Sequence, residues 1–122
     1  MSVLLDHTLL EAHDPDSGRY DALRVGQSLG LAPSEMAQLL DWSPRGLRKN
    51  PTSARLQRSL TQLMGTVTLL RELFDGSMVY VRVWLRAPHP ALDARTPLSY
   101  LLAGDLDTVE HLVSDIARGQ PG

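Results

Sequence analysis

The sequence predicts an all-α fold, and three observations support this prediction. Residues that begin and end helices recur along the chain at spacings that suit short helices. The segment from Ala54 to Phe74 carries an apolar residue at every third or fourth position, which is the period of one helix face. Only residues 78–85 alternate in the manner of a strand, and a single strand has no partner for its backbone groups. We therefore expect a helix there as well.

The first half of the chain predicts an arm followed by three short helices. Residues 1–18 are polar and end in Asp-Pro-Asp-Ser-Gly, so we expect a mobile arm. Apolar spacing then indicates a first helix over Tyr20–Leu29. Pro33 suits the first turn of the next helix, and Ser43-Pro44 supplies the cap and first turn of a third.

The second half predicts one long helix and a compact group of short ones. The long apolar stripe suits a central core helix, and a dimeric coiled coil is the alternative interpretation. Pro88 and Pro90 predict an extended elbow. Thr96-Pro97 opens a short helix, and Asp107 with Glu110 has the form of a capping box that opens the last one. The stripe itself consists of Leu56, Leu60, Leu63, Val67, Leu70 and Phe74.

Composition limits the classes of function that this chain can serve. Its 122 residues, 43% of them hydrophobic, suit one compact domain or two small helical subdomains. The sequence has no cysteine, no apolar run close to the roughly 20 residues of a membrane span, and an acidic start unlike that of a signal peptide. We therefore expect a cytoplasmic protein.

The sequence carries no pattern typical of catalysis or of metal binding. Its four histidines do not have the spacing of a zinc-binding helix. It also has no Walker loop, no dinucleotide-binding glycine pattern and no nucleophile elbow. We expect a protein that is not an enzyme and that uses neither a cofactor nor a metal.

A basic segment interrupts an otherwise acidic chain and coincides with a helix-turn-helix pattern. The net charge is −2, yet residues 42–58 hold five bases and no acid. The sequence departs from the pattern at two positions. Asp41 stands at a turn position that usually holds glycine. Asn50 stands at a later position that is usually apolar, so we expect a shortened second helix. Aligned on Ala37, the pattern places at its buried positions Met36, Leu40, Trp42 and Leu47.

The exposed side of the second helix in this pattern would face nucleic acid. Basic side chains neutralise phosphates, and a hydroxyl at a helix start can bind one. The alternative is a helical hairpin that packs and binds nothing. The residues expected to contact DNA are Ser43, Arg45, Arg48, Lys49 and Arg55.

The last third of the chain carries an ordered set of residues that generic core patterning does not require. Trp84-Leu85 is followed by Pro88, Leu92, Thr96-Pro97-Leu98, Leu101, Gly104, and a helix with Val109, Leu112, Ile116 and Gly119. In order and spacing, this set resembles the toxin-binding domain of Xre/MbcA/ParS-type antitoxins, over residues 78–120. One departure is Ala94, because family members often have glycine before the basic residue and the proline.

The resemblance implies a concrete function. Such antitoxins pair with RES-domain toxins, which are enzymes that destroy NAD, and silence them by covering the active-site entrance. Through the basic segment we also expect repression of the antitoxin's own operon, by a homodimer or by a larger hetero-oligomer with the toxin. Arg118 has an alternative interpretation, in which it does not contact the toxin and its positive charge only stabilises the C-terminus of the last helix. The toxin-binding residues that the resemblance implies are Pro88, His89, Pro90, Leu92, Arg95, Arg118, Gly119 and Gln120.

These interpretations divide the chain into three parts. They are a mobile arm at 1–18, a helix-turn-helix-like region with the central helix at 19–76, and a toxin-binding domain with a C-terminal tail at 77–122. Two other functions stay open: a helix-turn-helix transcriptional regulator without an enzyme partner, and an adaptor that has lost DNA binding. A plain regulator would have no need of the C-terminal module, so that module favours the antitoxin.

Overall fold

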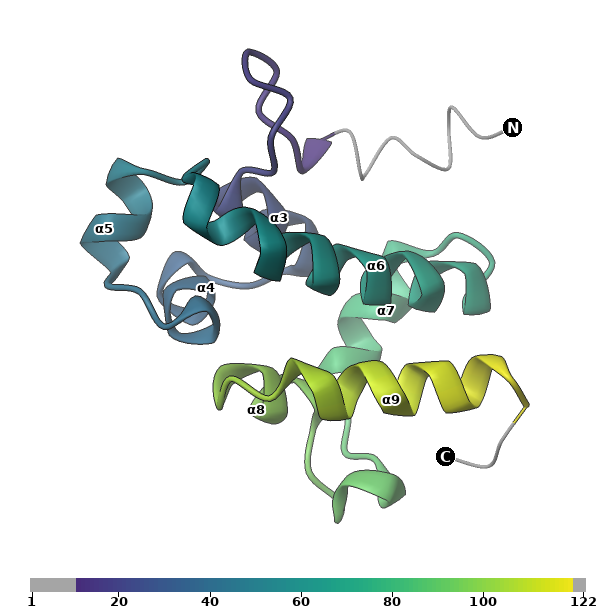
Figure 1. The fold of residues 1–122 in the computed structure, drawn as a ribbon. Coiled ribbons are helices and arrows are strands. Elements are labelled where there is room, and N and C mark those ends of the chain that lie inside the picture. The colour runs from purple at the N-terminus through teal and green to yellow at the C-terminus, as the bar shows by residue number, and fades with distance from the viewer. Residues whose placement is uncertain (1–10, 120–122) are drawn as a thin grey trace. The chain divides into compact units, whose positions relative to one another are not determined.

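The structure, a computed structural model, describes residues 11–119. The regular elements in this part of the chain are all helices, and it has no strand beyond two isolated backbone bridges (Figure 1). The predicted all-α fold is thus confirmed. No helix within the described residues is both long enough and apolar enough to cross a bilayer. The elements are α3 (Ala22–Leu29), α4 (Pro33–Leu40), α5 (Pro44–Lys49), η1 (Ala54–Leu56), α6 (Gln57–Leu73), α7 (Met78–Leu85), η2 (Pro90–Leu92), α8 (Pro97–Leu102) and α9 (Leu106–Ala117).

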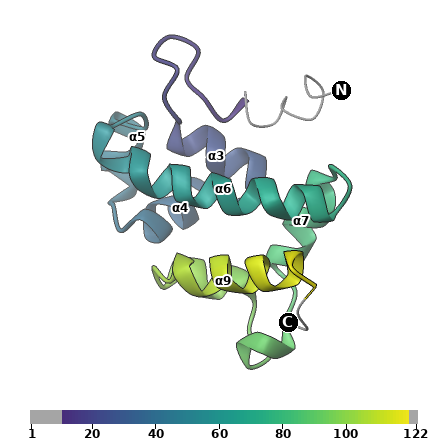
Figure 2. The ribbon, with the colours of Figure 1, turned by 45° about the vertical axis from the view of Figure 1, so that its right-hand side comes forward.

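The chain divides into two compact units, Met1–Met64 and Gly65–Gly122. In the first unit, α3, α4 and α5 pack against one another (Figures 1 and 2). The carboxylate of Asp21 begins α3 by accepting hydrogen bonds from the amides of Leu23 and Arg24, at 2.9 and 3.1 Å. Gly30 ends α3 with a φ of 71°, as expected of a glycine that follows a helix.

Residues 11–20 precede this group, and the first ten residues of the predicted arm lie outside the described part. The rings of His13 and Tyr20 stack with their centroids 4.2 Å apart, and their backbones form an antiparallel bridge. The predicted first helix begins two residues later than the apolar pattern indicated, because Tyr20 belongs to this bridge and Asp21 supplies the cap.

The predicted apolar stripe of the central helix is buried. Leu56, at the end of η1, is 2% exposed, and Leu60, Leu63, Val67 and Leu70 on α6 are each no more than 2% exposed. Phe74 lies just beyond the last residue of α6 and is half-buried. Because a single copy of the chain buries these side chains, the stripe is a core face rather than an exposed coiled-coil seam.

Residues 78–85, which alternate like a strand, form the helix α7, as expected. The hydroxyl of Ser77 accepts a hydrogen bond from the amide of Tyr80 at 3.3 Å and so caps the helix start. Met78, Val81 and Leu85 form the buried face. Helical hydrogen bonds satisfy the backbone of this segment internally, which the single strand could not do.

The helices α8 and α9 pack against each other and complete the second unit together with α7. Thr96 caps α8, because its hydroxyl accepts a hydrogen bond from the amide of Ser99 at 3.1 Å. The cap of α9 is Asp105 and not the predicted Asp107. The two carboxylate oxygens of Asp105 accept hydrogen bonds from the amide and the hydroxyl of Thr108, at 3.1 and 2.7 Å, so that the helix begins one residue after Asp105.

Candidate functional site

The elbow between α7 and α8 is a closed loop, which corrects the prediction of an extended segment. The amide of His89 donates a hydrogen bond to the carbonyl of Arg95 at 2.9 Å, and the amide of Ala94 donates one to the carbonyl of His89 at 3.1 Å. The backbone reverses direction through two left-handed residues, Asp93 with a φ of 55° and Ala94 with a φ of 62°. Backbone hydrogen bonds within the chain itself therefore close the loop.

Most of the predicted toxin-binding residues of the elbow are accessible. Pro88, Pro90 and Arg95 are exposed, and His89 is half-buried, with its ring in an edge contact 6.1 Å from that of Trp84. The Arg95 guanidinium lies over the ring of Tyr100, 5.9 Å from its centroid. Leu92 differs from the others, because it is only 3% exposed and packs into the core.

The predicted tail residues lie at the C-terminal end of α9. Arg118 is the C-cap, and its Nη2 donates to an Asp115 carboxylate oxygen at 2.6 Å; the two side chains are 67% and 45% exposed. Gly119 is exposed, and its φ of 78° is one that favours glycine. Gln120 lies outside the described residues.

An exposed apolar face on α7 was not among the predicted site residues. Val79, Tyr80 and Val83 are 61%, 62% and 58% exposed, although each has a large hydrophobic side chain. They lie on the side of the helix opposite its buried face. The available signal was that apolar residues occur on every side of this segment, with Arg82 as its single charged residue, and such a helix needs a second partner to cover it. Such a patch is typical of an interaction surface.

In the first unit, α4 and α5 pack against each other and are joined by a short turn. Asp41 takes the left-handed conformation at the turn, with a φ of 57°. Of the four expected buried positions, Met36 and Leu47 are buried, whereas Leu40 and Trp42 are half-buried. The second helix, α5, has only 6 residues and ends at Lys49, so the expected shortening is also observed.

The predicted DNA-binding side chains are grouped at α5 and at η1. Ser43 caps α5 by accepting a hydrogen bond from the amide of Gly46 at 2.9 Å, and its hydroxyl can still donate to a phosphate. No carboxylate among residues 11–119 forms an ion pair with these bases, so their positive charge is uncompensated nearby. The exposed basic residues are Arg45, Arg48, Lys49, Arg55 and Arg58.

Comparisons with known proteins gave one family match and one similar solved structure. Residues 69–119 match the model of the antitoxin Xre/MbcA/ParS C-terminal toxin-binding domain. A chain of the crystal structure of the M. tuberculosis MbcT–MbcA toxin–antitoxin complex has a similar fold, with a TM-score of 0.58 and 22% identity, over 80% of this chain and 91% of that one. A search of curated proteins gave no significant match. The resemblance to antitoxins with this domain, predicted for residues 78–120, is therefore confirmed.

Proposed function

We propose that this chain, whose residues 69–119 match the toxin-binding domain of Xre/MbcA/ParS antitoxins, is the antitoxin of a type II toxin–antitoxin pair. The family match over the elbow, α8 and α9 is the observation that carries this proposal. The partner is a RES-domain toxin that degrades NAD, and the antitoxin neutralises it by blocking the entrance to its active site. The chain itself acts by binding and carries out no catalysis.

The elbow and the tail suit the role of a steric block. A loop already closed by hydrogen bonds loses little conformational entropy when it docks. The ion pair of Arg118 with Asp115 is exposed, and exposed pairs stabilise a protein by only about 0–1 kcal/mol. Arg118 can therefore exchange Asp115 for an acidic group of the toxin at little cost.

The apolar face of α7 supports a protein partner over a small-molecule one. Val79, Tyr80 and Val83 belong to the segment that matches the toxin-binding domain. Burial of apolar surface contributes roughly 25 cal/mol per Å². We propose that this face contacts the toxin together with the elbow and tail residues Pro88, His89, Pro90, Arg95, Arg118, Gly119 and Gln120. Leu92 is buried and holds the elbow in place by packing in the core.

The basic residues of the first unit support a second role, repression of the antitoxin's own operon. Ser43, Arg45, Arg48, Lys49 and Arg55 would bind operator DNA, as a homodimer or in a larger complex with the toxin. This action places the protein in the cytoplasm. The exposure of these bases and the left-handed turn at Asp41 support the proposal.

A helix-turn-helix transcriptional regulator without an enzyme partner is the second candidate function. It is favoured by the same exposed bases at α5 and η1, which would contact DNA whether or not the chain also binds an enzyme. The two candidates differ in what unit Gly65–Gly122 does. A plain regulator would tolerate surface changes there, whereas an antitoxin would lose toxin neutralisation.

Co-expression with the RES-domain protein encoded by an adjacent gene tests the proposal. We expect the antitoxin to restore growth of cells that express this toxin, and to co-purify with it as a stable complex. A variant with Val79, Tyr80 and Val83 each changed to Ser should fold, bind DNA and fail to restore growth. If the unmodified chain neither rescues growth nor binds a RES-domain neighbour, the antitoxin proposal is wrong.

A further inference from the structure

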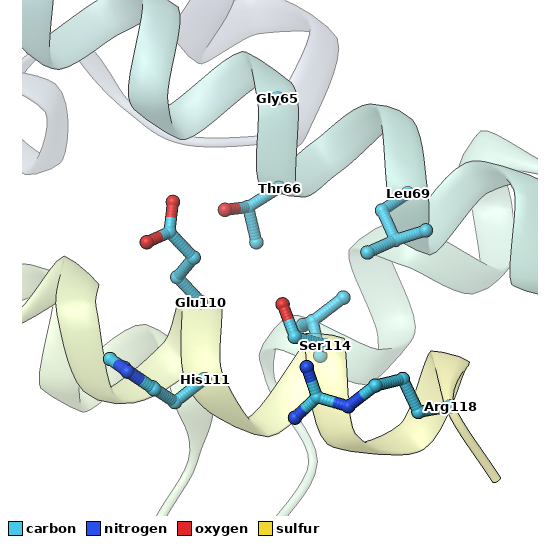
Figure 3. A pocket seen from close by; sticks show the side chains of 8 residues that line it. Gly65, Thr66, Leu69, Glu110, His111, Ser114 and Arg118 are labelled. Carbon is cyan, nitrogen blue, oxygen red and sulfur yellow. The ribbon is translucent and has the colours of Figure 1, made fainter.

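A pocket of about 330 Å³ lies within the second unit, between the C-terminal half of α6 and one face of α9 (Figure 3). This volume is at the small end of the roughly 300–1,000 Å³ that ligand pockets occupy. Figure 3 shows side chains of both helices directed into the space between them. Among the residues that line the pocket are Gly65, Thr66 and Leu69 from α6, and Glu110, Ser114 and Arg118 from α9.

Gly65 is an unexpected residue at the wall of this pocket. It lies in the middle of α6, where glycine destabilises a helix by about 1 kcal/mol relative to alanine. Packing does not require it, because a Cβ at this position would meet no atom within 4 Å. Gly26 on α3 is different, since a Cβ there would collide with Met36. The missing side chain at Gly65 therefore keeps the backbone of α6 open to a visiting group.

The uncompensated charge at the pocket is negative. Glu110 is half-buried and forms no ion pair or side-chain hydrogen bond within residues 11–119. The positive charge of Arg118 is already balanced by Asp115 at 2.6 Å. Nδ1 of His111 lies 2.7 Å from the carbonyl of Asp107 and donates to it. If Arg118 moved from the wall of the pocket to an acidic group of the toxin, the pocket would lose that positive charge and become more acidic.

We propose that this pocket receives a long cationic side chain, lysine or arginine, from the toxin. Glu110 supplies the opposite charge, Ser114 a hydroxyl acceptor, and Leu69 an apolar surface for the aliphatic stem. The occupant belongs to the toxin because the lining residues other than Gly65 and Thr66 fall within the toxin-binding match. This inference rests on the proposed antitoxin function and names a contact that the function does not itself require.

Titration calorimetry of the full-length chain with the purified toxin tests the pocket. Gly65→Leu fills it and should weaken binding by at least about tenfold. Glu110→Gln removes the charge and should weaken binding about tenfold, with a smaller dependence on salt. The control for Gly65→Leu is Thr61→Leu, which places a leucine at an exposed site on α6. The control for Glu110→Gln is Glu72→Gln, which removes an exposed carboxylate from α6, away from the pocket. Both controls should bind within about twofold of the unmodified chain.

A milder variant separates an effect on the pocket from an effect on folding. Gly65→Ala should raise the melting temperature, because alanine favours the helix, and should still weaken toxin binding. Unchanged affinity of Glu110→Gln, or of a folded Gly65→Leu variant, would overturn the pocket inference and leave the antitoxin proposal standing. Failure of the unmodified chain to bind the toxin would overturn both.

Discussion

The amide of His89 and the carbonyl of Arg95 are joined by a hydrogen bond of 2.9 Å, and this contact closes the elbow. The chain can return to Arg95 only because Asp93 and Ala94 both adopt positive φ angles. Aspartate tolerates this conformation, but alanine pays a steric penalty there of roughly 1–2 kcal/mol. Ala94 is therefore the strained residue of a loop that we assign to toxin binding.

The strain at Ala94 predicts that Ala94→Gly stabilises the protein. Relief of the steric penalty, less the greater chain entropy of glycine, should raise the free energy of unfolding by about 0.5–1 kcal/mol. Chemical denaturation measures this difference. Ala91→Gly is the matched control, because Ala91 lies in η2 without a positive φ and should lose stability. Equal destabilisation by both changes would show that Ala94 is not strained.

The position of the tail predicts that it contributes more to inhibition than to assembly. Removal of residues 117–122 should raise the antitoxin concentration for half-inhibition of NAD hydrolysis at least about tenfold, while the complex still co-elutes on gel filtration. Removal of 120–122 alone leaves Arg118 and Gly119 in place and isolates the last residues. Unchanged inhibition by the longer deletion would contradict the steric block.

The exposed bases of α5 predict a salt-dependent interaction with DNA. Arg48→Ala and Lys49→Ala should each weaken binding of an upstream DNA fragment, and each should reduce the slope of log affinity against log salt by about 1. Fluorescence anisotropy at several salt concentrations measures both quantities. Arg24→Ala, an exposed base on α3, is the control. A slope that does not respond to either α5 change would argue against phosphate contacts.

The cap of α9 predicts a stability difference at acidic pH. The Thr108 hydroxyl, and then its amide, donate to Asp105 and hold the pKa of this carboxyl below its usual value. The unfolded chain therefore binds the proton more readily. The ionised Asp105 cap therefore adds to the free energy of unfolding above the pKa of this carboxyl in the unfolded chain, which is about 3.9. This contribution is lost as the pH falls through the lower pKa of Asp105 in the folded protein. Asp105→Asn keeps a good cap but does not titrate.

Chemical denaturation at neutral pH and near pH 3 measures how much stability the unmodified chain and Asp105→Asn each lose in acid. The unmodified chain should lose more stability between these conditions than Asp105→Asn does, because only the former has a carboxylate to protonate at this cap. Thr108→Val, which removes the hydroxyl donor and keeps the shape, should reduce the difference as well. Identical acid losses in all three proteins would rule out this cap as the source.

Features that depend on short stretches of sequence could be predicted. The N-caps Ser43 and Thr96 are local signals, since each side chain accepts from an amide three residues later. The helix over 78–85 followed from the lack of any strand partner. The site residues depend on packing, and sequence spacing does not contain that information. The burial of Leu92, the exposed side of Tyr80 and the open wall at Gly65 arise only once helices meet.

The elbow shows a further reason for the limits of prediction. Alanine is a poor choice for a positive φ, so the signal for a tight reversal was the glycine that family members often carry where this chain has Ala94. The closed loop is stable because backbone hydrogen bonds offset the strain of that residue. Where hydrogen bonds override the conformational preference of a residue in this way, that preference does not predict the backbone conformation.

The packing of α3, α4 and α5 on one another, and of α8 on its successor α9, has a kinetic consequence. Helices that contact their neighbours along the chain need only short loops to close, so the entropic barrier to folding is low. We expect folding within microseconds to milliseconds, as for other proteins rich in local contacts. A newly made chain would then reach its binding-competent form long before it meets a toxin molecule by diffusion.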